Sequence, residues 1–244
     1  MGLTMLAFKR AGQFAILAVL LAVLGIAVLA SPARADLIKD CDGDDDEVAI
    51  KACTQLIQQN PRNATAYYNR GVSYQNLDRE AEALESYNEA IKINPKNSDY
   101  FHNRASAHDR LGNLDRTIED FNTALKLSPS DASSIGPRAW ARARANKELK
   151  EALADLDVLV KKDPKAGAPF VTRSLVYYRL KQWKEAIADA DSAIKLYEKN
   201  EDALYIRGMA KIAAGDEKGG NEDLAAARAI DANVPDYFAK YGIK

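Results

Sequence analysis

The sequence predicts an all-α solenoid of about five helix-turn-helix repeats, and three observations lead to this fold class. The composition suits a packed, helix-rich protein, with 47% apolar and 28% charged residues but only 13 Gly and 8 Pro among 244 residues. An arginine returns at steps of 34, 34, 35 and 34 residues: Arg70, Arg104, Arg138, Arg173 and Arg207. A small residue follows each of them: Gly71, Ala105, Ala139, Ser174 and Gly208. Because small side chains let helices approach to about 8–10 Å, this column predicts a helix crossing in every repeat.

Residues 1–35 are predicted to be an export signal that is cleaved after Ala35. Lys9 and Arg10 precede an apolar run over residues 11–30, and Ala33 and Ala35 have the small-residue spacing of a signal cleavage site. We therefore expect a periplasmic or secreted protein. An apolar run of about 20 residues is also long enough to cross a bilayer, so a retained anchor over residues 11–30 is the alternative.

The charge of the mature chain disfavours nucleic acid as a partner. Removing residues 1–35 takes away three basic residues and no acidic one, which leaves 31 basic and 35 acidic residues, a net charge of about −4. The chain also has no basic tract of the kind that neutralises phosphates. Contact with a membrane is expected only if the apolar segment is retained.

Residues 36–63 are predicted to form an N-terminal half-repeat cap. The stretch DEVAIKACTQLIQQNP matches only the second helix of a repeat, so we expect its partner helix to be missing. In an oxidising compartment the close pair Cys41 and Cys53 indicates a disulfide, worth about 3 kcal/mol in the chain-entropy model. The disulfide would hold a short segment in place of the absent helix.

The five repeats are expected at residues 64–97, 98–131, 132–166, 167–200 and 201–234. A bulky apolar residue stands three places before each arginine: Tyr67, Phe101, Ile135, Phe170 and Leu204. Prolines close the units at Pro61, Pro95, Pro129 and Pro164, because their rings cannot continue a helix. The third repeat departs from the pattern: it has one extra residue between Arg144 and Ala152, and Arg142 takes a column that is aromatic elsewhere.

This 34-residue pattern of two amphipathic helices resembles the tetratricopeptide repeat. The resemblance covers residues 64–234 and implies a right-handed solenoid whose ligands lie along a concave face formed by the first helices. The ends of such an array need covering. We therefore expect residues 235–244 to form a C-terminal cap helix that covers the last repeat with Tyr237, Phe238 and Tyr241.

The recurring arginine has two interpretations. An acidic column runs through the second helices: Asp120, Asp155, Asp189 and Asp223. One cation and one anion per repeat, both beside packing positions, favour an internal ionic ladder that fixes the helix register. The alternative is that the arginines face the groove and bind carboxylates of a ligand.

The resemblance projects a peptide-binding groove onto the first helices. The expected groove residues are Tyr68, His102, Arg110, Trp140, Arg144, Leu175, Tyr178, Arg179 and Tyr205. Arg110, Arg144 and Arg179 share one repeat position, so they form a predicted basic row with a spacing of about 10 Å, and aromatic residues surround them. A peptide with acidic and aromatic side chains would suit this groove. The alternative is that the arginines are solvated and the aromatic residues pack between repeats.

No catalytic, metal or cofactor site is predicted. The acidic run DCDGDDDE at residues 40–47 lacks the Gly and the distant Glu of a calcium loop, and the two histidines, His102 and His108, do not share a helix face. We expect an exported, non-enzymatic scaffold that binds a peptide or protein segment in its groove. The alternatives are a membrane-anchored scaffold, or a regulatory subunit that docks on an enzyme through its convex face.

Overall fold

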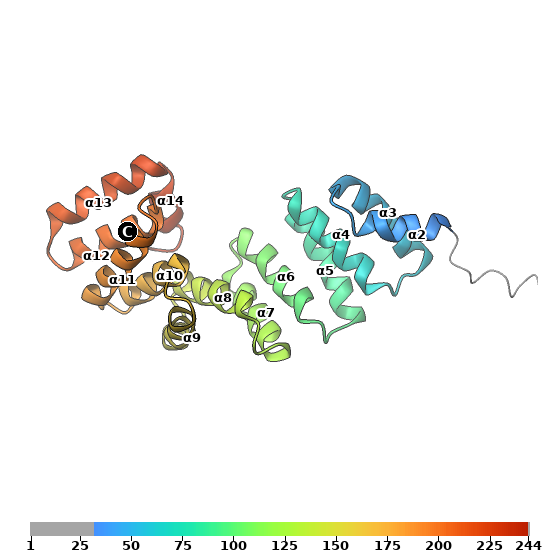
Figure 1. Cartoon of the computed structure of the whole chain (residues 1–244), viewed down its shortest axis with the longest axis horizontal. Coiled ribbons are helices and arrows are strands. Elements are labelled where there is room, and N and C mark those ends of the chain that lie inside the picture. The colour runs from blue at the N-terminus through green and yellow to red at the C-terminus, as the bar shows by residue number, and fades with distance from the viewer. Residues whose placement is uncertain (1–31, 244) are drawn as a thin grey trace, which may run out of the picture.

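The computed structural model describes residues 32–243, and within them the chain is entirely helical, with thirteen helices and no strand. Figure 1 shows these helices stacked in sequence order along an extended array. The helices are α2 (Pro32–Cys41), α3 (Asp46–Gln59), α4 (Ala64–Asn76), α5 (Glu80–Ile93), α6 (Ser98–Arg110), α7 (Leu114–Leu127), α8 (Ala132–Ala145), α9 (Leu149–Lys162), α10 (Gly167–Arg179), α11 (Trp183–Leu196), α12 (Glu201–Ala213), α13 (Glu217–Ile230) and α14 (Val234–Ala239). The all-α solenoid predicted from the sequence is confirmed.

The array consists of five helix pairs, which we number as repeats 1 to 5: α4–α5, α6–α7, α8–α9, α10–α11 and α12–α13. Each helix packs against the next along the chain. Four of the five first helices begin at polar caps, where a side-chain oxygen accepts a hydrogen bond from a main-chain amide of the first turn: Asn63, Asn97, Asp131 and Asn200. We call the surface formed by α4, α6, α8, α10 and α12 the concave face.

The small residues after the recurring arginines lie at the helix crossings. A Cβ atom on Gly71 would come within 2.5 Å of the Tyr87 ring, and one on Gly208 within 2.8 Å of the main-chain oxygen of Gly220. Ala105 and Ala139 hold the same position in repeats 2 and 3 and are completely buried. The paired helices therefore approach too closely for larger side chains, as the sequence pattern predicted.

The N-terminal end differs from expectation, because a helix does precede Cys41. The sequence analysis expected this partner helix to be missing, but α2 packs against α3 and α4. At 10 residues it is shorter than α4, which has 13. The predicted disulfide is present and joins Cys41, at the end of α2, to Cys53 in α3, with a Cα–Cα distance of 4.8 Å.

The predicted export signal lies mainly outside the described residues, and so does the apolar run over residues 11–30. The expected cleavage point after Ala35 falls within α2. Among the helices from α2 onward, none is both long enough and apolar enough to cross a membrane.

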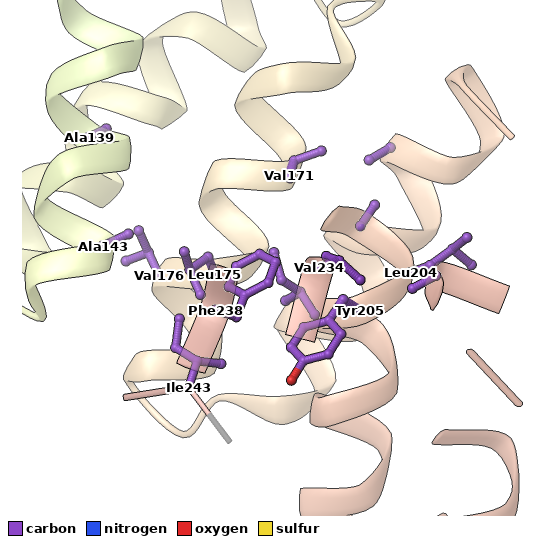
Figure 2. Close-up of a cluster of buried hydrophobic side chains, with 14 of the residues drawn as sticks. Ala139, Ala143, Val171, Leu175, Val176, Leu204, Tyr205, Val234, Phe238 and Ile243 are labelled. Carbon is purple, nitrogen blue, oxygen red and sulfur yellow. The ribbon is translucent and has the colours of Figure 1, made fainter. Parts of the chain in front are cut away.

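The largest hydrophobic core lies in repeats 3 to 5 and includes the C-terminal segment. Figure 2 shows Phe238 and Val234 of α14 among side chains of α10 and α12, with Leu175 and Tyr205 close by. Phe238, Val234 and Ile243 are each at most 1% exposed. The C-terminal segment is thus part of the core.

Candidate functional site

The recurring arginine forms an ion-pair ladder inside the solenoid. Arg104 donates from Nε and Nη2 to the two carboxylate oxygens of Asp120, at 2.8 and 2.7 Å, and Asp120 is buried. The same double contact joins Arg138 to Asp155, Arg173 to Asp189 and Arg207 to Asp223. In repeat 1, Arg70 donates to the hydroxyl of Ser86. The ladder interpretation is confirmed, because these guanidinium groups bridge helices of the protein itself.

Each recurring arginine also reaches back to the preceding repeat, which the sequence analysis missed. Arg104 donates from Nη1 to Asn88 of α5 at 2.7 Å, and Arg173 donates to Asp157 of α9 at 2.7 Å. The partner always lies 16 residues before the arginine: Thr54, Asn88, Asn122, Asp157 and Asp191. One side chain therefore ties two successive second helices together. The signal was a column of Asn, Asp and Thr at this fixed offset.

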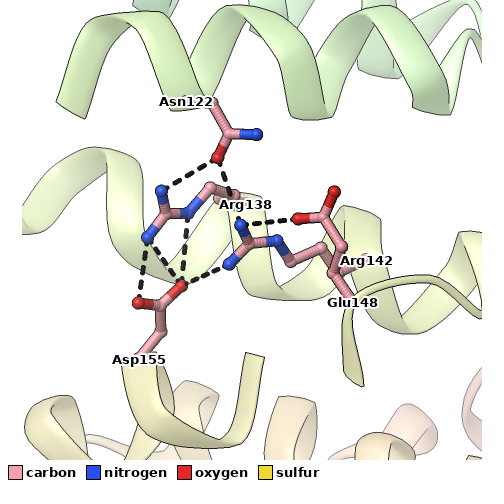
Figure 3. A network of polar contacts seen from close by, with 5 residues as sticks. All are labelled: Asn122, Arg138, Arg142, Glu148 and Asp155. Carbon is pink, nitrogen blue, oxygen red and sulfur yellow. Dashed lines mark hydrogen bonds and ion pairs between the residues drawn. The ribbon is translucent and has the colours of Figure 1, made fainter. Parts of the chain in front are cut away.

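In repeat 3 a second arginine joins the ladder. Figure 3 shows Arg138 and Arg142 sharing the carboxylate of Asp155 and the amide oxygen of Asn122, while Glu148 binds Arg142 from the turn. Arg142 is 5% exposed. The position that is aromatic in neighbouring repeats is thus filled by a cation that is paired with Asp155 and Glu148, which accounts for the departure seen in the sequence.

The predicted basic row also contacts the preceding repeat. Arg110 donates to Asp78, in the turn between α4 and α5, at 3.0 Å and to Glu80, the first residue of α5, at 3.2 Å. Arg144 is 4% exposed and pairs with Asp109. Arg179 donates to the main-chain oxygens of Ala143 and Arg144 at 3.1 and 3.0 Å. The row lies on the first helices as predicted, and its charges are engaged within the protein.

The C-terminal segment covers the concave face of repeats 3 to 5. The indole of Trp140 on α8 donates to the Tyr237 hydroxyl at 3.2 Å, across 97 positions of sequence. Phe238 lies parallel to the Tyr205 ring, with centroids 4.9 Å apart. Arg179 donates to the main-chain oxygen of Tyr241 at 2.5 Å. Predicted groove residues from three different repeats therefore meet on one segment of the same chain.

The remaining predicted groove residues lie in repeats 1, 2 and 4. In repeats 1 and 2, the Tyr68 hydroxyl accepts a hydrogen bond from Asn103 at 2.7 Å, and His102 Nδ1 lies 2.7 Å from the Ser134 hydroxyl. In repeat 4, Leu175 is fully buried, while Tyr178 packs on Trp183 with centroids 5.3 Å apart. The structure therefore divides the predicted site: Trp140, Arg144, Leu175, Arg179 and Tyr205 meet around the C-terminal segment, and Tyr68, His102 and Arg110 do not.

The phenols of this surface are electrically neutral at neutral pH, and burial extends that neutral range to higher pH. Burial raises the pKa of Tyr178, Tyr205 and Tyr237 above the ordinary tyrosine value. These side chains therefore offer aromatic faces and hydroxyl groups at neutral pH, and no negative charge.

An open groove remains beside the C-terminal segment. It has a volume of about 630 Å³ and lies between α8 and α10, with apolar walls that include Pro137, Trp140, Pro169 and Tyr197. Asp202, in the first turn of α12, lines the same groove. Burial, reinforced by the neighbouring carboxylates of Glu201 and Asp231, raises the pKa of Asp202 to about 6. Asp202 was not among the predicted groove residues.

One histidine contact has the residue types of a hydrolase triad but a different geometry. Ser134 donates its hydroxyl proton to Asp131 at 2.7 Å, so His102 Nδ1 donates to Ser134 and does not take its proton. Ser134 is fully buried. The contact therefore links repeats 2 and 3 at the start of α8 and does not activate a nucleophile. Among residues 32–243, no group of three or more His, Cys, Asp or Glu side chains is arranged to hold a metal.

Comparisons with known proteins agree with this architecture. One tetratricopeptide repeat model matches residues 64–97, and a second tetratricopeptide repeat model matches residues 86–119. No curated protein sequence matches the chain.

Several solved structures share the fold. A tetratricopeptide repeat protein from Parabacteroides merdae ATCC 43184 aligns with a TM-score of 0.63 at 18% identity, covering 88% of this chain and 100% of its own. PilW, described as a widely conserved type IV pilus biogenesis factor, aligns with a TM-score of 0.63 at 19% identity, covering 82% and 94%. YrrB, described as a tetratricopeptide repeat protein with an unusual peptide-binding site, aligns at 0.60 and 16% identity, covering 75% and 94%. The two matched repeat models and the solenoid shared with these structures show that this chain contains tetratricopeptide repeats and has their fold.

Proposed function

We propose that this protein is an exported, non-catalytic scaffold that binds a peptide or protein segment along its concave face. One observation carries the proposal: the concave face of repeats 3 to 5 already holds a segment of polypeptide, namely residues 234–243. It does so with Trp140, Arg144, Arg179 and Tyr205, four side chains that the sequence analysis chose for peptide binding.

The resident segment indicates the chemistry that this face favours. Its aromatic rings pack on Trp140 and Tyr205, and its main chain is bound by the guanidinium of Arg179. Stacked aromatic rings and charge-assisted hydrogen bonds are the usual anchors of protein interfaces. A partner segment with aromatic side chains suits the same surface, either beside residues 234–243 or in their place.

Export is supported by the N-terminal region. The signal-like segment precedes a chain whose two cysteines are joined in a disulfide, and disulfides persist in oxidising compartments. Two solved structures with the same fold offer analogies. PilW is described as a type IV pilus biogenesis factor, and YrrB is described by its unusual peptide-binding site. A role in assembly at the cell envelope follows from that analogy.

The full chain is expressed in its exporting host and used to capture partners from envelope extract, which tests the proposed binding. Mass spectrometry of the same protein identifies the N-terminus of its mature form, which tests the proposed export. Two variants place a bulky cation on the concave face, Ser106→Arg in repeat 2 and Ala168→Arg in repeat 4. The matched control, Val158→Arg, adds the same side chain to α9, where Val158 is 58% exposed. We expect a captured partner to be lost from a concave variant and retained by Val158→Arg.

The opposite pattern, with loss only in Val158→Arg, would assign binding to the convex face and overturn the proposal. The triple charge reversal of Arg110, Arg144 and Arg179 is unsuitable for this test. Arg144 is buried and paired with Asp109, so reversing its charge would disturb folding as well as binding.

A further inference from the structure

The open groove between α8 and α10 combines apolar walls with one carboxylate. Tyr197 stands at its edge, 58% exposed, and its ring lies over Gly167 so closely that a Cβ atom there would come within 2.5 Å. Pro137 and Pro169 add rigid apolar surface, and the Trp140 indole separates the groove from the C-terminal segment. A groove of this size with apolar and aromatic walls and one polar group is a typical place for a ligand.

Asp202 is the charged group of this groove. Between residues 32 and 243, no side chain forms a hydrogen bond or ion pair with its carboxylate. The nearby cation, Arg144, is already paired with Asp109. A second hollow on the other side of Asp202 is lined by three more carboxylates and one lysine: Glu201, Asp231, Asp236 and Lys240. The potential at this end of the groove is therefore negative.

We propose that this groove binds an arginine or lysine side chain carried on an apolar segment of the bound partner, with Asp202 accepting its positive charge. The inference rests on the proposed function and identifies the partner chemistry at repeats 3 and 4. The apolar stem of such a side chain packs on the groove walls, and its cation lies near the faces of Tyr197 and Trp140. A partly desolvated carboxylate without a partner is unfavourable, so a cation at Asp202 removes an existing penalty.

The same geometry disfavours an acidic partner at this place. The sequence analysis expected acidic side chains to meet Arg144 and Arg179, but those guanidinium groups bind Asp109, the tyrosine hydroxyls and main-chain oxygens. Among the residues that line the groove, the one charged side chain is that of Asp202. An acidic ligand would also face repulsion from Glu201 and Asp231.

The test compares two probes of nearly the same shape, the cationic Nα-benzoyl-arginine amide and the neutral Nα-benzoyl-citrulline amide. Both are titrated at pH 7.5 into the ¹⁵N-labelled full chain, and binding is followed through the Trp140 indole and the amides of α12. We expect the arginine probe to bind at least tenfold more tightly than the citrulline probe. Asp202→Asn is expected to abolish that preference, while Tyr197→Ala weakens both probes. The control Glu201→Gln, which neutralises a carboxylate outside the groove, is expected to change the preference less than threefold.

Three results would each overturn the proposal. The wild-type chain could bind the two probes equally, the NMR signals could fail to shift at millimolar probe concentration, or Asp202→Asn could keep the preference for the arginine probe. Light scattering on the same samples tests a second copy as the occupant: self-association that Asp202→Asn abolishes would also overturn it. Each of these failures leaves the capture experiment untouched, because a partner lost from Ser106→Arg would still support binding to the concave face.

Discussion

Phe238 lies flat against Tyr205, with ring centroids 4.9 Å apart and an angle of 5° between the planes. Phe238 is completely buried, although it lies six residues from the end of the sequence. The sequence analysis expected the final helix to cover the last repeat. The contact between Trp140 and Tyr237 shows that it reaches back to repeat 3 as well. The C-terminal segment therefore joins three repeats into one packed unit.

Replacing Phe238 with alanine is expected to destabilise the protein by about 3 to 5 kcal/mol, the usual cost of removing a buried phenylalanine ring. The loss would free α14 and expose Trp140 to solvent. Urea titrations followed by circular dichroism and by tryptophan emission measure both effects. Tyr197→Ala is the control: its ring is 58% exposed, so its cost should stay below about 1 kcal/mol. Equal stability of the two variants would contradict the role given to the segment.

The ladder predicts that Arg104→Leu destabilises the protein by about 3 kcal/mol, because Asp120 would remain as a buried carboxylate without its partner. The double variant Arg104→Leu with Asp120→Leu should recover most of this loss, since no uncompensated charge is left. Thermal and urea denaturation of the three proteins check this prediction.

Repeat 1 offers the matched control for the ladder. Arg70 occupies the same repeat position but donates to the neutral hydroxyls of Ser86 and Thr54. Arg70→Leu should therefore cost only about 1 kcal/mol, the value of an ordinary hydrogen bond. A cost equal to that of Arg104→Leu would show that the buried carboxylate is not the source of the effect.

The features that sequence reasoning found are those that recur. The small residues at the helix crossings and the arginine column return every 34 or 35 residues in five aligned copies, and the aspartates return in four, which separates them from chance similarity. Contacts within one repeat and between neighbours depend only on local geometry. For this reason the pairing of Arg104 with Asp120 was predictable.

The features that sequence reasoning missed occur once in the chain. Nothing in the pattern around Tyr237 specifies a contact with Trp140, 97 positions away, because a single segment has no periodicity to fix its place. Asp202 belongs to the first turn of a helix, where acidic residues are common, and only the packing of α8, α10 and α14 around it makes it distinctive. In the same way, α2 was missed because its sequence lacks the columns of the other first helices.

Reducing the bond between Cys41 and Cys53 is expected to lower stability by about 3 kcal/mol, the entropic value for a loop of this length. The disulfide fastens α2 to α3, the first two helices of the residues that the structure describes. Hydrogen exchange should therefore accelerate first over residues 41–60, while the amides of α12 keep their protection. Loss of protection over the whole array at once would contradict a local role for the disulfide.

The carboxyl group of Asp202 predicts a specific dependence of stability on pH. Its pKa is raised to about 6 in the folded chain, mainly by burial, whereas an unfolded aspartate titrates near 3.9. At pH 4 the group is protonated in the folded state and about half protonated in the unfolded state, so it carries little penalty, and at lower pH it carries none. As the pH rises through 6 the folded protein must hold a desolvated charge, so the stability of the wild type falls relative to a variant without that charge.

Asp202→Asn should therefore match the wild type near pH 4 and exceed it by about 1 to 3 kcal/mol at pH 7.5. Urea denaturation at both pH values measures the difference. Glu201→Gln provides the control, because the carboxylate of Glu201 contributes to the raised pKa of Asp202. Removing that neighbouring charge should shift the pH dependence toward lower pH without abolishing it. If the advantage of Asp202→Asn is the same at pH 4 and pH 7.5, Asp202 is not a desolvated carboxylate in the folded protein, and it is then no acceptor for a partner's cation.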